Sequence, residues 1–144
     1  MEKKLENRVT KPEPVIKIQN LHKSFGDLSV LKGVDIVANK GEVISLIGSS
    51  GSGKSTLLRC ANLLENSQQG KIFFDGEEIK WRGTGEDRAP ADANQVRLMR
   101  TNLSMVFQQF NLWSHMTVLQ NVMEAPVSVL GLEKEKAKEN ALDY

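Results

Sequence analysis

The chain has 144 residues, enough for one domain with a sizeable core, and its charge is nearly balanced at 19 basic against 18 acidic residues. This balance excludes the strongly basic field that is typical of nucleic-acid-binding proteins, so no nucleic-acid partner is expected. A single cysteine, Cys60, excludes an internal disulfide and is expected to be a buried packing residue.

The first third of the chain predicts a charged tail followed by three strands. Residues 1–14 (MEKKLENRVTKPEP) are charged and proline-punctuated, so we expect a disordered tail rather than a secretory signal. Residues 15–19 and 30–38 have strand patterns, with turns expected at 24–27 and 39–41. Residues 43–47 (VISLI) are mostly apolar and β-branched, which is typical of a strand buried on both faces.

Residues 54–64 predict an amphipathic helix after a glycine-rich loop. Its apolar face would contain Leu57, Leu58, Ala61 and Leu64. Further on, residues 71–74 and 77–79 predict a hairpin that closes on Asp75-Gly76. Residues 82–93 are polar and interrupted by Gly and Pro, which indicates a surface loop.

The remaining chain predicts mainly helix. Residues 95–100 form one short helix in this interpretation, and residues 103–107 (LSMVF) form another buried strand. Thr117 is positioned to cap a helix that ends near Leu130, with Pro126 expected to kink or restart it. The last dozen residues, EKEKAKENALDY, are strong helix formers. No apolar run approaches the ~20 residues that a membrane-spanning helix needs.

The loop GSSGSGKS, residues 48–55, matches the full phosphate-binding pattern G-x-x-x-x-G-K-[ST]. Its glycines let the backbone curl so that successive N–H groups point toward one oxyanion, and the following helix directs its positive end to the same place. Lys54 would reach the β- and γ-phosphates of a nucleoside triphosphate, Ser55 would ligate Mg²⁺, and Thr56 would bond the α-phosphate. The predicted nucleotide-binding residues of this segment are Gly48, Ser49, Ser50, Gly51, Ser52, Gly53, Lys54, Ser55 and Thr56.

Three longer segments extend this pattern into a family resemblance. They are LHKSFGDLSVLKGVDIVANKGEVISLIGSSGSGKSTLLRCANLLE, GKIFFDGEEI and MVFQQFNLWSHMTVLQNVMEAP. Together they resemble the ATP-binding subunits of ABC transporters, most closely importers of polar amino acids of the histidine and lysine/arginine/ornithine type. The resemblance covers residues 15–144. It implies an α/β P-loop NTPase fold of the ABC type, with an antiparallel β subdomain and the start of both the parallel core sheet and the helical subdomain.

The resemblance also assigns roles outside the loop. Phe25 corresponds to the aromatic residue that stacks on adenine. Gln108 corresponds to the Q-loop glutamine that reaches Mg²⁺ and the attacking water, and with Lys54 it makes up the expected catalytic set. An apolar and aromatic cluster follows and is either the permease dock or a core of the helical subdomain; it comprises Phe110, Leu112, Trp113, His115 and Met116. His115 is not the family's switch histidine, and His22 is expected at the surface in the first turn.

The family hydrolyses ATP with parts that are not found in these residues. The sequence has no LSGGQ-like signature, no acidic catalytic strand and no switch histidine; residues 72–75 (IFFD) imitate that strand, but Gly76 follows where a catalytic acid belongs. The chain is thus expected to be the N-terminal portion of such a domain, which binds ATP without hydrolysing it. A small kinase or GTPase is disfavoured by the lack of an Arg-rich lid and of an N-K-x-D guanine reader. A non-catalytic nucleotide-binding or regulatory module stays open as an alternative.

The resemblance further implies the partners and the location of the complete protein. The expected partners are permease membrane subunits, a second ATP-binding subunit as a homodimer and, indirectly, a periplasmic binding protein. The expected location is the cytoplasmic face of the bacterial inner membrane.

Overall fold

The structure is a computed structural model that describes residues 14–144, so most of the predicted tail lies outside the described residues. The described residues form two compact units. The first ends at Leu103, and the second runs from Ser104 to Tyr144. Each unit is described by itself.

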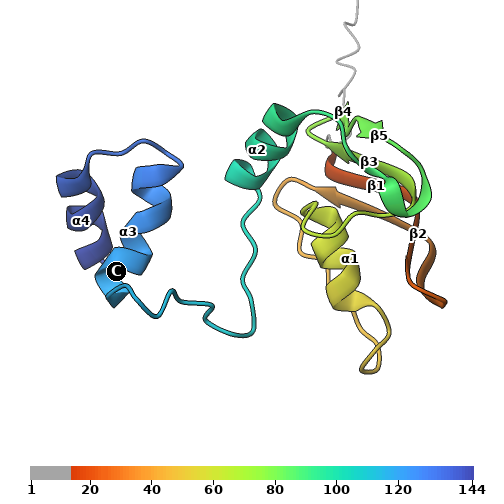
Figure 1. The fold of residues 1–144 in the computed structure, drawn as a ribbon, viewed down its shortest axis with the longest axis horizontal. Coiled ribbons are helices and arrows are strands. Elements are labelled where there is room, and N and C mark those ends of the chain that lie inside the picture. The colour runs from red at the N-terminus through yellow and green to blue at the C-terminus, as the bar shows by residue number, and fades with distance from the viewer. Residues whose placement is uncertain (1–13) are drawn as a thin grey trace, which may run out of the picture. The chain divides into compact units, whose positions relative to one another are not determined.

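The first unit is built on a four-stranded antiparallel sheet (Figure 1). Its strands are β1 (Pro14–Phe25), β2 (Leu28–Asn39), β3 (Gln69–Phe74) and β4 (Glu77–Glu78), in the order β2-β1-β3-β4. The predicted strands at 15–19 and 30–38 are confirmed and are longer than expected. The predicted hairpin is confirmed too, because Asp75 and Gly76 both have positive φ, 46° and 81°, as a tight hairpin turn requires. His22 lies within β1 and is half-buried, so its predicted place in the first turn is wrong.

Helix α1 (Lys54–Ala61) packs against β1 and β2 and closes the core of this unit. It buries Leu57 and Cys60, whereas Leu58 and Leu64 are exposed, so the predicted apolar face is only partly correct. The helix ends at Ala61, and Leu63 then takes a positive φ of 54°. This turn of the chain directs Leu63 rather than Leu64 into the core. The buried cluster contains Ile18, Leu21, Leu31, Leu57, Cys60, Leu63, Ile72, Phe74, Ile79 and Met99.

The segment between β4 and the next helix has more structure than the predicted surface loop. A two-stranded ribbon joins β5 (Trp81–Arg82) and β6 (Ala89–Pro90), with a 3-10 turn, η1 (Gly85–Asp87), between them. The Arg88 guanidinium lies 4.1 Å from the centroid of the Trp81 ring. This stacking adds to the backbone pairing of β5 with β6.

The predicted helix at 95–100 is confirmed as α2 (Ala93–Asn102). Its N-cap, Asp92, accepts hydrogen bonds from the backbone N–H groups of Asn94 at 2.9 Å and Gln95 at 3.2 Å. The buried Met99 anchors the helix in the core.

Replacing Asp92 with alanine should lower the free energy of unfolding by about 1 kcal/mol, because two N-terminal donors of α2 lose their acceptor. Urea denaturation of both proteins measures the difference. Asp92→Asn, which keeps an acceptor oxygen, should restore most of the loss. Equal stability of the alanine variant and the unchanged protein would contradict the capping role.

The two segments predicted as buried parallel strands, residues 43–47 and 103–107, are not strands in the structure. Their apolar side chains are largely exposed: Val43 and Ile47 are 90% and 95% accessible, and Val106 is 95% accessible. A strand is maintained by hydrogen bonds to a neighbour, and no neighbour among residues 14–144 pairs with either segment. The antiparallel subdomain is therefore present, whereas the expected start of the parallel sheet has no pairing here.

The second unit consists of two helices that pack against each other, α3 (Val118–Ser128) and α4 (Lys134–Leu142) (Figure 1). The predicted cap is confirmed as a capping box: the Thr117 hydroxyl accepts from the Gln120 N–H, and the Gln120 side chain accepts from the Thr117 N–H. Helix α3 does not restart at Pro126 but continues through it and ends at Ser128. Among residues 14–144, no helix combines the length and the apolar character needed to cross a membrane.

Candidate functional site

The glycine-rich loop curls around the ammonium group of Lys54, the first residue of α1. The Lys54 Nζ donates to the backbone oxygens of Gly48 at 2.8 Å and Ser49 at 2.7 Å, and to the Ser52 hydroxyl at 3.2 Å. The Ser52 N–H closes a turn on the Ser49 oxygen at 3.3 Å. Residues 48–54, here called the glycine ring, thus curl around one positive charge.

Glycines are required at two positions of this ring. A Cβ at Gly48 would lie 2.7 Å from the Ser52 hydroxyl oxygen, so a side chain there would displace a hydroxyl that contacts the Lys54 ammonium. Gly53 has φ of 90°, and a Cβ would lie 3.1 Å from side-chain carbons of both Val30 and Leu31. Only glycine lets the loop approach β2 this closely.

The loop borders a cavity of about 270 Å³. Its lining consists of Val30, Ser50, Gly51, Ser52, Gly53, Lys54, Ser55 and Thr56. The cavity lies at the N-terminus of α1, where Gly53 provides no side-chain cap for the first N–H groups of the helix. Uncapped N–H groups, the positive end of the helix dipole and the Lys54 charge all favour an anion. The structure thus brings together residues of the loop that the sequence assigned to phosphate.

Phe25, the predicted base-stacking residue, is the last residue of β1 and is 47% exposed. It pairs in register with Leu28 of β2, and Val30 of the same strand lines the cavity. Phe25 therefore lies at the end of β1, and the neighbouring strand β2 borders the phosphate loop. Its role in stacking stays a prediction.

The predicted site residues that follow Leu103 belong to the second unit. Gln108 is exposed and lies in an irregular segment before α3. In the cluster after it, Phe110, Leu112 and Trp113 are exposed, whereas Met116 is half-buried. These three side chains are thus not a core of the two-helix unit as described.

Asn121 of α3 shapes this irregular segment. Its side-chain oxygen accepts from the Trp113 N–H at 2.8 Å, and its amide group donates to the backbone oxygens of Trp113 at 3.2 Å and Thr117 at 2.9 Å. The segment that carries the exposed cluster is therefore held at the start of α3.

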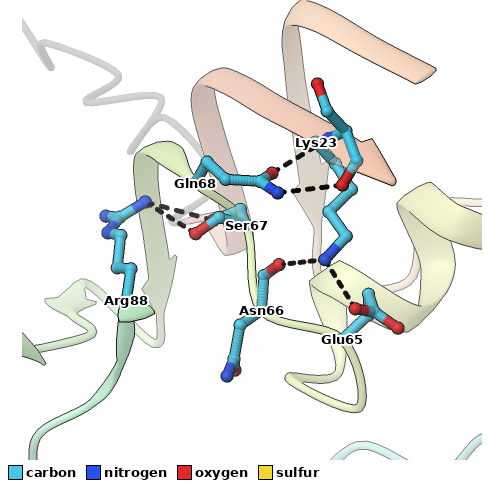
Figure 2. A network of polar contacts seen from close by, with 7 residues as sticks. Lys23, Glu65, Asn66, Ser67, Gln68 and Arg88 are labelled. Carbon is cyan, nitrogen blue, oxygen red and sulfur yellow. Dashed lines mark hydrogen bonds and ion pairs between the residues drawn. The ribbon is translucent and has the colours of Figure 1, made fainter. Parts of the chain in front are cut away.

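A polar network near the end of β1 was not predicted from the sequence (Figure 2). It joins Lys23 and Ser24 of β1 to Glu65, Asn66 and Gln68, which follow α1. In the same segment Ser67 accepts a hydrogen bond from the Arg88 guanidinium. The contacts from β1 span 43 and 44 residues of sequence. No local pattern signals such contacts. The one available signal is a polar run, residues 65–69 (ENSQQ), between two apolar elements.

Cys60 is buried, as predicted, and no part of its surface is accessible. Burial raises the pKa of the Cys60 thiol from 9.0 to about 11, and the Glu65 carboxylate adds to the shift while Lys23 opposes it. The thiol thus stays protonated at neutral pH and packs as a small apolar group.

Cys60 should react slowly with iodoacetamide at pH 8 in the folded protein and much faster in urea. Thiolate is the reactive form, and a rise of two pKa units lowers its fraction about a hundredfold. Because the pKa of Cys60 is higher in the folded protein, the unfolded chain loses the thiol proton at lower pH. The free energy of unfolding should therefore fall as the pH rises from about 9 to about 11. Mass spectrometry measures labelling of this single cysteine, and equal rates in buffer and urea would contradict its burial.

Comparison with known proteins decides the family. Residues 31–143 match the family model of the ABC transporter. The chain belongs to the ABC transporter family. This segment contains the whole phosphate loop, helix α1 and the glutamine segment.

Two curated relatives share more than half of the aligned residues with this chain. The histidine/lysine/arginine/ornithine transport ATP-binding protein HisP of Escherichia coli is 56% identical over 133 residues, which is 92% of this chain and 52% of HisP. The arginine/ornithine transport ATP-binding protein AotP of Pseudomonas aeruginosa is 57% identical over 90% of this chain and 51% of AotP. The chain thus spans about half the length of the curated relatives it matches.

A solved structure supports the fold. The dimeric structure of MJ0796, described as a bacterial ABC transporter cassette, superposes with a TM-score of 0.74 at 30% identity. The match covers 89% of this chain and 54% of MJ0796. The chain therefore has the fold of the matching part of an ABC cassette.

Proposed function

We propose that this chain provides the ATP-binding site of an ABC importer for a polar or basic amino acid. The observation that carries the proposal is the glycine ring around Lys54, which leaves an anion-binding cavity at the start of α1. Membership of the ABC transporter family supports ATP as the anion. The names of HisP and AotP, which refer to basic amino acids, support the substrate class.

In the proposed mechanism the first unit binds both the phosphates and the base of the nucleotide. The backbone N–H groups of the loop and Lys54 hold the β- and γ-phosphates, and Thr56 bonds the α-phosphate. Phe25 stacks on the base, and its 47% exposure leaves surface for this contact. Bound Mg²⁺, with the Ser55 hydroxyl as a protein ligand, would neutralise charge on the phosphates. Ser55 is suited to this because its hydroxyl is exposed in the first turn of α1 and lines the cavity.

Fluorescence competition tests this site. A fluorescent ATP analogue should bind the 144-residue protein in the presence of Mg²⁺ and be displaced by ATP and by tripolyphosphate. Displacement by tripolyphosphate isolates the phosphate contribution, because this ligand has no base. A bound analogue that tripolyphosphate does not displace would contradict a site built on the phosphate loop.

The partners are proposed by the same reasoning. A permease membrane subunit would dock on the exposed apolar side chains that follow Gln108, namely Phe110, Leu112 and Trp113. Large exposed apolar side chains suit such an interface, and Asn121 fixes the backbone of one of them, Trp113. A second ATP-binding subunit is proposed because the MJ0796 cassette is described as dimeric. The proposed location is the cytoplasmic face of the inner membrane, and the binding protein of the importer would act indirectly.

We further propose that a protein of these 144 residues binds ATP without hydrolysing it. The sequence contains no LSGGQ-like signature and no acidic strand that ends in a general base. Gln108 can orient a water molecule but cannot remove its proton, because an amide is not a base at neutral pH. In this reading the chain alone behaves as a nucleotide-binding module. Steady phosphate release that Lys54→Ala abolishes would contradict it.

A further inference from the structure

Residues 65–68, between α1 and β3, contact the end of β1, and two of these residues bind the side chain of Lys23 (Figure 2). The Lys23 Nζ lies 2.6 Å from the carboxylate Oε1 of Glu65 and donates to the backbone oxygen of Asn66 at 2.8 Å. The Lys23 side chain is 9% exposed and that of Glu65 is 30% exposed. The lysine end of this pair is largely shielded from water, unlike the lysines of the surface ion pairs, which are 58% and 59% exposed.

Gln68 holds the backbone beside this lysine. Its side-chain amide accepts from the Ser24 N–H at 2.9 Å and donates to the Ser24 oxygen at 2.8 Å, and its own N–H donates to the His22 oxygen at 3.0 Å. Residues 22–24 are thus fixed on both sides of Lys23. The next residue along the strand is Phe25.

The Lys23 ammonium also lies over the ring of Phe25, 4.7 Å from its centroid. A cation at this distance is attracted to the face of an aromatic ring. The ring has a second face, and Phe25 is 47% exposed, so one face is held by the lysine while surface remains for a flat ligand. The contact restricts the orientation of Phe25 before any ligand binds.

We propose that Lys23 is a positioning residue for the nucleobase. Lys23 holds the Phe25 ring in its stacking orientation. Through Glu65 and Asn66 it also connects that ring to the segment that follows α1. The first turn of α1 borders the phosphate cavity. The inference rests on the proposed ATP site and adds a residue that sets its geometry. Lys23 reaches the nucleobase through Phe25 and is not a catalytic residue.

A double-mutant cycle separates positioning from a merely structural role. Affinities for Mg-ATP and for tripolyphosphate are measured for the unchanged chain, Lys23→Met, Phe25→Ala and the double variant. Lys23→Met should weaken ATP binding about two- to tenfold, the cost of ordering one side chain on binding. It should leave tripolyphosphate binding unchanged, and it should have no effect on ATP binding when Phe25 is already alanine. Lys23→Arg, which keeps a cation, should retain ATP affinity within about twofold.

Lys23→Met also leaves the Glu65 carboxylate without its partner, so a second variant guards against loss of folding. Gln68→Ala releases the Ser24 backbone without removing a charge, and it should weaken ATP but not tripolyphosphate. Equal weakening of both ligands, or the same loss from Lys23→Met with and without the Phe25 ring, would overturn the positioning role. If the unchanged chain binds neither ligand, the proposed ATP site itself fails and the inference fails with it.

Discussion

Replacing Lys54 with alanine should weaken the binding of Mg-ATP by about 1.5–3 kcal/mol, the scale of a charge-assisted contact. The substitution removes the one charge at the centre of the glycine ring, where Lys54 donates to Gly48, Ser49 and Ser52. The backbone N–H groups of the loop remain, so binding should be reduced rather than lost. Equilibrium titration with a fluorescent ATP analogue measures the change.

Lys138→Ala is a matched control for this experiment. Lys138 is an exposed lysine on α4, so its replacement removes the same charge from the second unit. The control should bind ATP as the unchanged chain does. Equal affinity in Lys54→Ala and the unchanged chain would contradict the assignment of the loop to phosphate, and equal loss in both variants would reduce the effect to net charge.

Replacing Phe25 with alanine should weaken the binding of ATP and of GTP alike, by about 1–3 kcal/mol, the range found for stacking of a base on an aromatic side chain. A flat aromatic face accepts any base, so the two nucleotides should compete within about one order of magnitude. Competition titrations with both nucleotides measure the two affinities. Phe25→Tyr keeps the ring and should retain binding.

Phe110→Ala is the control for this substitution, because it removes an exposed phenyl ring from the second unit. It should leave nucleotide affinity unchanged. A Phe25→Ala variant that binds ATP with full affinity but unfolds more easily would place the ring in the packing of the sheet instead of the site.

The features that the sequence predicted correctly are those in which short-range chemistry decides the structure. The glycine-rich loop before α1 has glycines at positions where a side chain would crowd a neighbour, as Gly48 and Gly53 show. The Asp75-Gly76 hairpin needs two residues of positive φ, and Thr117 with Gln120 forms a capping box within four residues. In the hairpin and the capping box the residues that decide the structure are neighbours in the chain, whereas Gly53 also fits against Val30 and Leu31 of β2.

The predictions that failed depend on partners far away in sequence. Residues 43–47 have the β-branched composition of a buried strand, yet a strand needs a neighbour, and none among residues 14–144 pairs with them. The Lys23–Glu65 pair was missed for a related reason, since it joins two polar residues that no periodic pattern connects. The candidate site could be predicted from its loop, whereas the contact between Lys23 and the Phe25 ring is visible only in the three-dimensional structure.

The most direct test of the account follows the fate of ATP on the 144-residue protein. The protein is incubated with Mg²⁺ and ATP labelled at the γ-phosphate, the complex is isolated on a desalting column, and its nucleotide is analysed. The account predicts that label is retained as intact ATP, that excess tripolyphosphate displaces it and that Lys54→Ala retains less. No retained nucleotide, or free phosphate released in repeated turnovers that depend on Lys54, would contradict it.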